Sequence, residues 1–362
     1  MEFVDPPSDQ SWDGFCTAAE AAWFWHGTRW RDYTIAYRPE LESRSMAFMV
    51  RDAGETVAAV PLMLERHREP DRLEFSFGGS ACWSPALAPG LGPRHTLHVL
   101  EAALVHVDGL ARSLGVVRVR WRLSPLGHGF LPQLAHLLTA TTRLGYVDVS
   151  GISQVIDVSQ SAVARRADAT KGHRADIGRA QRQLEVDALI GQDVSPSDFA
   201  GYVAMHALAA GRVTRPHRTF DLMERWLHEE RALLARARHG GAEVGYAYVL
   251  LHADGAYYAS AANLPEATLP IGHAIQGAVG EWLHDHGYHD YELGAQPRRP
   301  LLHEVPTAKD VAIARFKRGF GGVTVPLIER EKFYSRPFLV SVLQGRVSSF
   351  ADASPDPASE PP

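Results

Sequence analysis

The stretch ARFKRGFGG, residues 314–322, places cations beside an unobstructed backbone. Lys317 and Arg318 follow Phe316, and three of the next four residues are glycine. An ammonium group held in a water-poor cleft can bind a phosphate or stabilise an oxyanion, where one such donor is worth about 2.7–4 kcal/mol. The structural alternative is a helix C-terminus whose cations precede a glycine cap, worth about 0.3–1 kcal/mol. The stretch therefore predicts either the edge of an anion site or an ordinary helix end.

A candidate proton acceptor lies in the stretch YHDYELG, residues 288–294. We expect this run to be a strand, and alternation then places Asp290 and Glu292 on one face. Glu292 could take a proton from an attacking amine, either directly or through water. The alternative is a structural carboxylate that forms an ion pair with Arg298 or Arg299.

Three tyrosines are expected close to Glu292. Tyr257 and Tyr258 lie in the preceding predicted strand, residues 256–263, and Tyr291 adjoins Glu292 in the sequence. We expect Tyr258 to take part in the reaction and Tyr257 and Tyr291 to line the cleft. The alternative for one of the pair Tyr257 and Tyr258 is a place in the core.

A cationic helix is predicted within residues 164–186. Lys171 and Arg174 lie one turn apart on it, so they could clamp a phosphate of the donor or the acceptor. The alternative is a solvated helix on which Asp168 and Asp176 partly balance the charge. Arg318, close to Lys317, is a further candidate for binding the donor, and Arg315 for lining the cleft.

A second cationic group lies in the predicted strand 116–123, where Arg118, Arg120 and Arg122 alternate with apolar residues. Three guanidinium groups in a row could line a cleft and attract a polyanion such as a charged tRNA. The alternative is an exposed sheet face with no ligand.

The loop LPEATLPIG, residues 264–272, precedes a predicted helix that begins near His273. Backbone N–H groups at a helix N-terminus bind anions, which makes Gly272 and His273 candidates for binding phosphate. The loop holds one glycine, however, and the corresponding first-half stretch, residues 88–93, contains prolines that remove donors. The sequence therefore supports acetyl-CoA weakly and favours a different donor. The run HDHGYH, residues 284–289, lacks a third ligand at useful spacing, so no metal site is predicted.

An internal repeat indicates the elements that must position these residues. Residues 47–65 and 233–251 each contain an apolar run, a turn with Gly54 or Gly241, and a second apolar run. In both halves a further strand, a proline-containing loop, a long amphipathic helix and another strand follow. The order predicts an α+β fold of two tandem domains, each a mostly antiparallel sheet flanked by helices. We expect a first domain over 1–163, a second over 164–340 that carries the site, and a C-terminal extension and disordered tail over 341–362.

The composition limits the class of protein. The chain of 362 residues has 45% hydrophobic and 22% charged residues and a formal net charge of −5, which excludes a coat of basic charge for nucleic acid. Two cysteines cannot build a disulfide framework and fit a reducing compartment. No signal peptide and no membrane-spanning run is recognised, so a cytoplasmic protein without a membrane partner is expected. The sequence does not indicate the oligomeric state.

The repeat and these motifs together resemble the tandem form of the GNAT superfamily, and within it the Fem-type peptidyltransferases. The shared motifs are Lys171-Gly172-His173-Arg174 on a helix that opens the second domain, Tyr291-Glu292-Leu293-Gly294, and Phe316-Lys317 followed by Gly319-Phe320-Gly321. The resemblance covers residues 40–335 and is better in the second half. It implies a tandem GNAT-like fold, acyl transfer to an amine, and a place for Lys317 near the donor phosphate or the developing oxyanion. The acidic residue is Glu292 where aspartate is usual, and no coiled-coil arm is present, so a peptidoglycan precursor as acceptor does not carry over.

These inferences favour an acyltransferase that moves an aminoacyl group from aminoacyl-tRNA, or an acyl group, onto an amine of a small molecule or peptide. No bound cofactor is expected, and the co-substrate is aminoacyl-tRNA or acyl-CoA. One alternative is an acyl-CoA-dependent N-acyltransferase, and another is a GNAT-like pair that has lost catalysis and binds a ligand or partner. The acyl group and the acceptor stay open.

Overall fold

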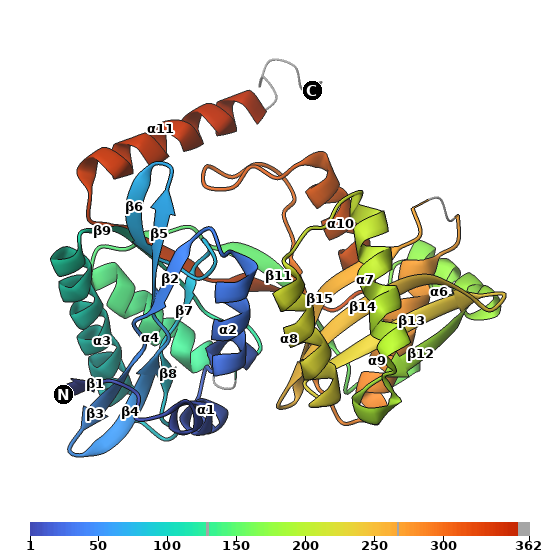
Figure 1. Ribbon diagram of the computed structural model, residues 1–362, viewed down its shortest axis with the longest axis horizontal. Helices are drawn as coiled ribbons and strands as arrows, with labels where there is room; N and C mark the ends of the chain where they lie inside the picture. The colour runs from blue at the N-terminus through green and yellow to red at the C-terminus, as the bar shows by residue number, and fades with distance from the viewer. Residues whose placement is uncertain (128–129, 266–267, 354–362) are drawn as a thin grey trace. The chain divides into compact units, whose positions relative to one another are not determined.

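The computed structural model describes residues 1–127, 130–265 and 268–353. The chain divides into two compact units that are discontinuous in sequence. Unit 1 consists of residues 1–152, 296–315 and 326–362, and unit 2 of residues 153–295 and 316–325. The ribbon in Figure 1 follows both from the blue N-terminus to the red C-terminal helix. Each unit is described by itself.

Unit 1 contains two sheets. The smaller has the strand order β1-β3-β4-β8, and the larger has the order β10-β18-β9-β6-β5-β2 with β7 beside β9. The strands of the smaller sheet are β1 (Glu2–Val4), β3 (Phe48–Asp52), β4 (Glu55–Val60) and β8 (Ala86–Leu87). Those of the larger are β2 (Glu42–Ser45), β5 (Met63–Arg68), β6 (Asp71–Phe75), β7 (Cys82–Trp83), β9 (Val116–Arg122), β10 (Val147–Asp148) and β18 (Glu329–Phe333).

The helices of unit 1 bury one face each. In α3 the side chains of Leu100, Leu104, Val107 and Ala111 are fully buried, as the predicted apolar stripe requires, and the helix ends at Gly115 with φ +71°. That backbone angle suits glycine, which closes the helix in the left-handed conformation. The helices are α1 (Asp9–Ala18), α2 (Thr28–Tyr37), α3 (Pro93–Leu114), α4 (Phe130–Arg143) and α11 (Arg336–Ala353).

Unit 2 is built on one seven-stranded sheet with the order β12-β13-β14-β15-β16-β11-β17. Its strands are β11 (Gly151–Asp157), β12 (Glu185–Leu189), β13 (Ala232–His239), β14 (Ala242–His252), β15 (Gly255–Asn263), β16 (Asp290–Ala295) and β17 (Val323–Leu327). Its helices are α5 (Ala162–Asp168), α6 (Lys171–Gln183), α7 (Pro196–Ala210), α8 (His217–His228) and α9 (Ile271–Asp285). Helix α10 (Ala308–Arg318) contains the boundary between the units.

Strand β14 is covered on both faces, which its doubly apolar sequence predicts. The Tyr248 hydroxyl donates to the Met223 carbonyl oxygen of α8 at 2.8 Å. On the opposite face, Ala247 and Val249 pack in one cluster with Val279 of α9. Helices therefore lie against both sides of the sheet, as Figure 1 shows for α7 to α9.

The internal repeat is confirmed as a repeat of structure. Both hairpins, β3–β4 and β13–β14, are antiparallel, and their turn glycines Gly54 and Gly241 have φ +88° and +82°. In each half one helix also joins two parallel strands: α3 connects β6 to β9, and α9 connects β15 to β16. The fold is therefore the predicted α+β tandem, with a mixed, mostly antiparallel sheet in each unit and a second, antiparallel sheet in unit 1.

The structure differs from the sequence-based expectations in three local features. The cationic helix within 164–186 is two helices, because Ala169 and Thr170 are extended and Thr170 caps α6. Residues 341–353 of the expected C-terminal extension belong to α11. Residues 354–362, at the end of the expected disordered tail, lie outside the described residues. The expected contiguous ranges 1–163 and 164–340 do not include the return of residues 296–315 and 326–362 to unit 1. No helix of the described residues is long and apolar enough to cross a lipid bilayer.

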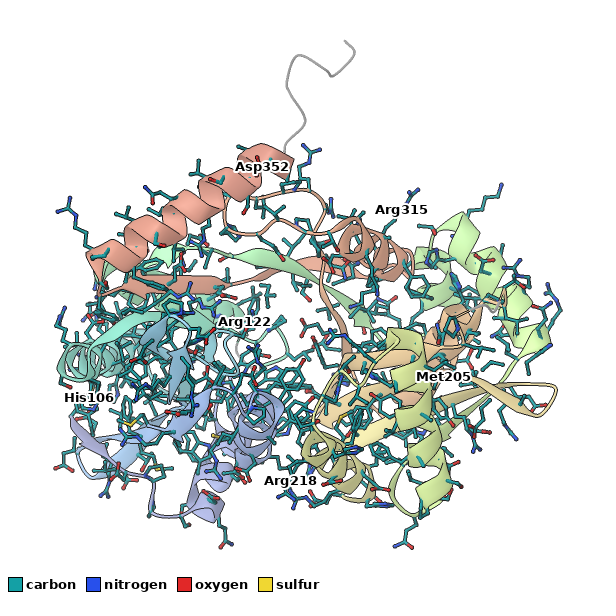
Figure 2. All side chains as sticks on the ribbon, turned by 45° about the horizontal axis from the view of Figure 1, so that its top comes forward. His106, Arg122, Met205, Arg218, Arg315 and Asp352 are labelled. Carbon is teal, nitrogen blue, oxygen red and sulfur yellow. The ribbon has the colours of Figure 1, made fainter. Side chains whose placement is uncertain are left out.

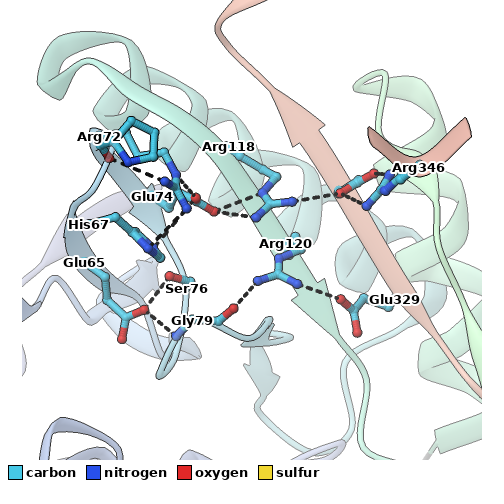
Figure 3. Close-up of polar contacts among 12 residues, drawn as sticks. Glu65, His67, Arg72, Glu74, Ser76, Gly79, Arg118, Arg120, Glu329 and Arg346 are labelled. Atoms are coloured by element: carbon cyan, nitrogen blue, oxygen red, sulfur yellow. Dashed lines mark hydrogen bonds and ion pairs between the residues drawn. The ribbon is translucent and has the colours of Figure 1, made fainter. Parts of the chain in front are cut away.

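The three arginines of β9 form ion pairs on one face of the unit 1 sheet, and Figure 3 draws those of Arg118 and Arg120. Arg118 contacts Glu74 at 2.8 Å, and Arg122 contacts Glu329 at 2.7 Å. Arg120 lies 3.7 Å from Glu329 and donates to the Gly79 carbonyl oxygen. The alternative of an exposed sheet face is therefore wrong. The sequence pattern does not reveal these ion pairs, because the carboxylates come from β6 and β18, which are remote from β9 in sequence.

Candidate active site

Strands β15 and β16 diverge in the middle of the unit 2 sheet. They pair in parallel over three positions, and Tyr257 opposite Glu292 is the last pair. On its other edge β16 pairs with β11 from Asp290 to Ala295. The partner register of β14 jumps from Tyr258 to Ser260, so Ala259 is an extra residue in β15, a bulge. Bulges redirect side chains and backbone groups, and they are frequent beside active sites.

Lys317 reaches this point of divergence from the end of α10. Its ammonium nitrogen lies 5.5 Å from the centre of the Tyr258 ring, a cation–π distance. A Cβ added to Gly294 would lie 3.5 Å from the Lys317 nitrogen and 3.2 Å from the Tyr257 hydroxyl. Gly294 also has φ +85°, a backbone angle that favours glycine. The missing side chain leaves the space in which these two polar groups approach the strand.

Glu292 is a buried carboxylate beside this lysine. It is 3% exposed, and Ser153 donates to its Oε1 at 2.6 Å. Burial lowers the pKa of Lys317, while the negative charge of Glu292 acts in the opposite direction. A half-buried cation and a buried carboxylate therefore lie close enough to influence each other, an arrangement that is frequent at sites of proton transfer.

The glycines of 314–322 serve close packing. A Cβ at Gly319 would overlap the His173 ring, and one at Gly322 would overlap the Val155 carbonyl oxygen. At Gly321 a Cβ would lie 2.8 Å from Asp168. Since the three approaches hold the segment against α5, α6 and β11, the run fixes the position of Lys317 and does not itself form an open phosphate loop.

An aromatic cluster covers the start of α9. The Phe316 ring lies where a side chain at Gly272 would stand, 2.8 Å from the added Cβ. His273 packs against His173, Phe316 and Phe320 with ring centres 4.6 to 5.4 Å apart. Burial lowers the pKa of His273 to about 4, so its ring is neutral near pH 7. Gly272 and His273 thus contact aromatic rings. Glu266 and Ala267 of the loop 264–272 lie outside the described residues.

The remaining predicted residues lie apart from this centre or have other contacts. Lys171 is exposed, and Arg174 donates to the carbonyl oxygens of Ala167 and Ala169 between α5 and α6. Arg318 is half-buried. Arg120 belongs to the ion-pair network of unit 1, and Arg315 is exposed on α10, where Figure 2 labels it.

Tyr291 faces away from Glu292, into the core cluster of α9 and Phe320. It is 1% exposed. The alternation that placed Glu292 toward Lys317 could also have assigned Tyr291 to the other face.

Sequence analysis missed two neighbours of the centre. Ser153, which binds Glu292, is 139 residues away in sequence and has no local signal. Gln276 of α9 lies close to the hydroxyl groups of Tyr258 and Tyr291, and it opposes the rise that burial gives to the pKa of each. Burial raises the pKa of Tyr258 to about 12. For Gln276, the one signal in the sequence was its position one turn into α9.

The fold was compared with known proteins. FemX matches with TM-score 0.71 at 12% identity, covering 95% of this chain and 100% of FemX. L-PGS from Bacillus licheniformis matches with TM-score 0.59 at 11% identity, covering 97% of this chain and 99% of that one. A tandem GNAT protein from the clavulanic acid biosynthesis pathway matches with TM-score 0.51 at 15% identity, covering 92% and 98%.

In the other comparisons no family model and no curated protein matches the chain. The structural matches extend over nearly the whole of both partners, so they include both units and the order of the elements within them. The chain therefore has the tandem GNAT-like fold of FemX and its structural relatives.

Proposed function

We propose that unit 2 transfers an acyl or aminoacyl group from an activated ester or thioester to an amine and forms an amide. The observation that supports this most is the pair of the half-buried Lys317 and the buried Glu292 at the point where β15 and β16 diverge. An ammonium ion and a carboxylate in a water-poor opening are the two groups that such a reaction needs. The fold shared with FemX is compatible with this chemistry.

The amine nitrogen attacks the carbonyl carbon of the donor, and the new C–N bond places negative charge on the carbonyl oxygen. The Lys317 ammonium group stabilises this oxyanion by charge and hydrogen bonding. Glu292, oriented by Ser153, accepts the proton that the nitrogen loses, directly or through water. Collapse of the intermediate breaks the C–O or C–S bond, and the proton passes to the departing oxygen or sulfur.

The favoured donor is aminoacyl-tRNA. In acyl-CoA binding of the GNAT type, the N-terminus of the helix after the splayed strand holds a pyrophosphate. Here Phe316 packs against Gly272 at that position, and Pro270 precedes the helix. The fold is also shared with the C-terminal domain of a putative lysylphosphatidylglycerol synthetase from Agrobacterium fabrum, with TM-score 0.55 at 12% identity, and that likeness is compatible with an aminoacyl donor. The exposed cations Lys171 and Arg174 on the same unit suit a phosphate backbone.

The experiment that tests the donor is filter binding of the protein to a radiolabelled pool of aminoacyl-tRNAs, with uncharged tRNA and acetyl-CoA as competitors. We expect retention of a charged species that falls at high salt and resists acetyl-CoA. Retention that acetyl-CoA abolishes would replace the tRNA donor by acyl-CoA. Absence of retention for every charged species, together with no binding of acyl-CoA, would favour a non-catalytic pair.

Transfer is then measured with the retained donor and a fraction of small amine-containing molecules. Label should move to an acid- and base-stable amide product when the wild-type protein is present. Label that appears solely as free amino acid would show hydrolysis and contradict the proposed reaction.

A further inference from the structure

Unit 2 has a pocket on the face of its sheet that carries α6 and α9. Its volume is about 160 Å³, and it lies between α5, α6 and α9 over β11 and β16. Ile156, Ile177 and Phe320 supply apolar walls. Two glycines of α9, Gly277 and Gly280, face it without side chains. Concave, mostly apolar sites with a few polar groups are typical of binding sites for small molecules.

The polar groups of this pocket are deeply buried. Gln276 is 6% exposed and Tyr291 is 1% exposed, and both line the cavity. By strict geometry neither atom of the Gln276 amide nor the Tyr291 hydroxyl has a hydrogen-bond partner among the described residues, although Gln276 lies close enough to the Tyr258 and Tyr291 hydroxyls to influence the pKa of each. A buried polar group without a partner is unfavourable, and a ligand that supplies one removes that penalty. The interior therefore suits an uncharged group such as a hydroxyl, which can both donate and accept.

The outer part of the pocket is cationic. Arg165 is half-buried, and its Nη1 donates to the Val158 carbonyl oxygen at 3.2 Å, which holds the guanidinium against the wall. Arg166 is exposed and lies over Gly178 of α6. Glu281 also lines the pocket and attracts Arg165. Within the lining the two guanidinium groups outnumber the one carboxylate, while Asp157 and Asp285 lie outside the lining and also attract Arg165.

We propose that this pocket binds a small apolar carboxylate that carries a hydroxyl group at its far end. The carboxylate lies near Arg165 and Arg166, the apolar body lies between Ile177 and Phe320, and the hydroxyl bonds to Gln276 and Tyr291. The pocket opens at α5, whereas Lys317 and Glu292 lie at the divergence of β15 and β16. The proposal is thus independent of acyl transfer at that centre, and binding is measured without any acyl donor.

Three matched probes separate the two polar ends. 3-(4-Hydroxyphenyl)propionate carries both groups, 3-phenylpropionate lacks the hydroxyl, and tyramine replaces the carboxylate by an amine. We expect the first to bind to the full chain in calorimetry and saturation-transfer NMR. Loss of the hydroxyl should weaken binding roughly 5-fold or more, because the buried amide and phenol then stay without partners. The amine should not bind.

Variants locate the probe. Gly277→Leu should abolish binding, because a Cβ there meets Ile177 at an ordinary 3.8 Å and a longer side chain extends into the cavity. Arg165→Gln should weaken the binding of the carboxylate probe roughly 5-fold, because it removes an attraction. Glu281→Gln should strengthen the binding, because it removes a repulsion. Gly345→Leu, at a helical glycine of α11 with open space around it, should leave binding unchanged.

The proposal is overturned if none of the three probes binds at millimolar concentration, since the pocket then holds water alone. It is also overturned if the three bind equally, or if Gly277→Leu and Arg165→Gln both retain wild-type affinity. Should Gly277→Leu fail to fold, Arg165→Gln and Glu281→Gln decide the matter by their opposite signs.

Discussion

At the scale of the residue, the environment of Lys317 determines what it can do. A lysine in water is charged near neutral pH. Burial of Lys317 lowers its pKa and so disfavours the charged form, whereas the nearby carboxylate of Glu292 favours it. The ammonium form is the one that stabilises an oxyanion. The rate of transfer should therefore depend on the protonation of Lys317, and Glu292 should influence that protonation.

Glu292→Gln is expected to move the alkaline limb of the pH profile. Activity falls as pH rises through the pKa of Lys317, and that pKa lies below the ordinary 10.5 because the amine is buried. Loss of the Glu292 charge removes the influence that raises it, so the limb should shift to lower pH, in addition to a lower maximal rate. The measurement is kcat/KM of transfer against pH. Glu185→Gln, at an exposed carboxylate of the same unit, serves as control, and an unshifted limb in Glu292→Gln would show that Glu292 does not influence the titrating group.

Gly319→Ala is expected to destabilise the protein by about 1–3 kcal/mol, because the added methyl group overlaps the His173 ring. Combined with His173→Ala it should cost less than the sum of the single changes, since the overlapping ring is gone. Gly345→Ala in the exposed α11 should instead stabilise by about 0.5–1 kcal/mol. Urea unfolding measures the stability of the wild-type protein, of the three single variants and of the double variant. Equal effects of Gly319→Ala and Gly345→Ala would show that the close approach to His173 does not matter.

At the scale of the element, the periodicity of the sequence predicted the helices and hairpins that depend on residues close together in the chain. The stripe of α3, its end at Gly115 and the two glycine hairpins follow from local patterns and are present. The ion pairs of β9 could not be predicted, because Glu329 lies 207 residues from Arg122 and reaches it through β18. The same limit applies to Ser153 beside Glu292, which depends on β11 pairing with β16.

Arg346→Gln is expected to loosen α11 from the unit 1 sheet. Both terminal nitrogens of Arg346 donate to Glu331, which is fully buried, and none of the residues of α11 is buried. Without Arg346 this carboxylate keeps Arg118 at 3.7 Å, a weaker contact, so unfolding should be easier by about 1–3 kcal/mol. Hydrogen exchange should accelerate in residues 336–353. Arg112→Gln is the control, because Arg112 is exposed and lies 3.9 Å from the buried Asp108, and equal exchange in both variants would argue against this anchor.

At the scale of the whole molecule, the chain crosses between its units four times, at residues 152, 295, 315 and 325. A linear sequence pattern divides a chain into consecutive segments, so it does not reveal that 296–315 returns to unit 1 before Lys317 enters unit 2. The tandem fold was predictable because each half repeats its own elements. The position of the boundaries was not, because they depend on which strands pair.

A chain that begins at residue 164 should fail to form a folded unit 2. It lacks β11, which lies between β16 and β17 in the sheet and supplies Ser153 to Glu292. Missing pairs on both sides expose the edges of two strands. A chain that begins at residue 150 keeps β11 and is the matched comparison. Circular dichroism and urea unfolding should show a cooperative transition in the longer chain alone, and an equal transition in both would show that β11 is dispensable.

The most direct test of the central claim compares single-turnover transfer by the wild-type protein and Lys317→Met with the donor retained in filter binding. The methionine side chain keeps an unbranched apolar stem without the charge. The account predicts a loss of roughly 10²-fold or more in the rate of amide formation. The melting temperature should fall somewhat, because the buried Glu292 then lacks its cationic neighbour, so both rates are measured at a temperature at which both proteins are folded. Transfer within about 3-fold of wild type, far less than the loss of one such donor gives, would contradict the assignment of the Lys317 and Glu292 pair as the reaction centre.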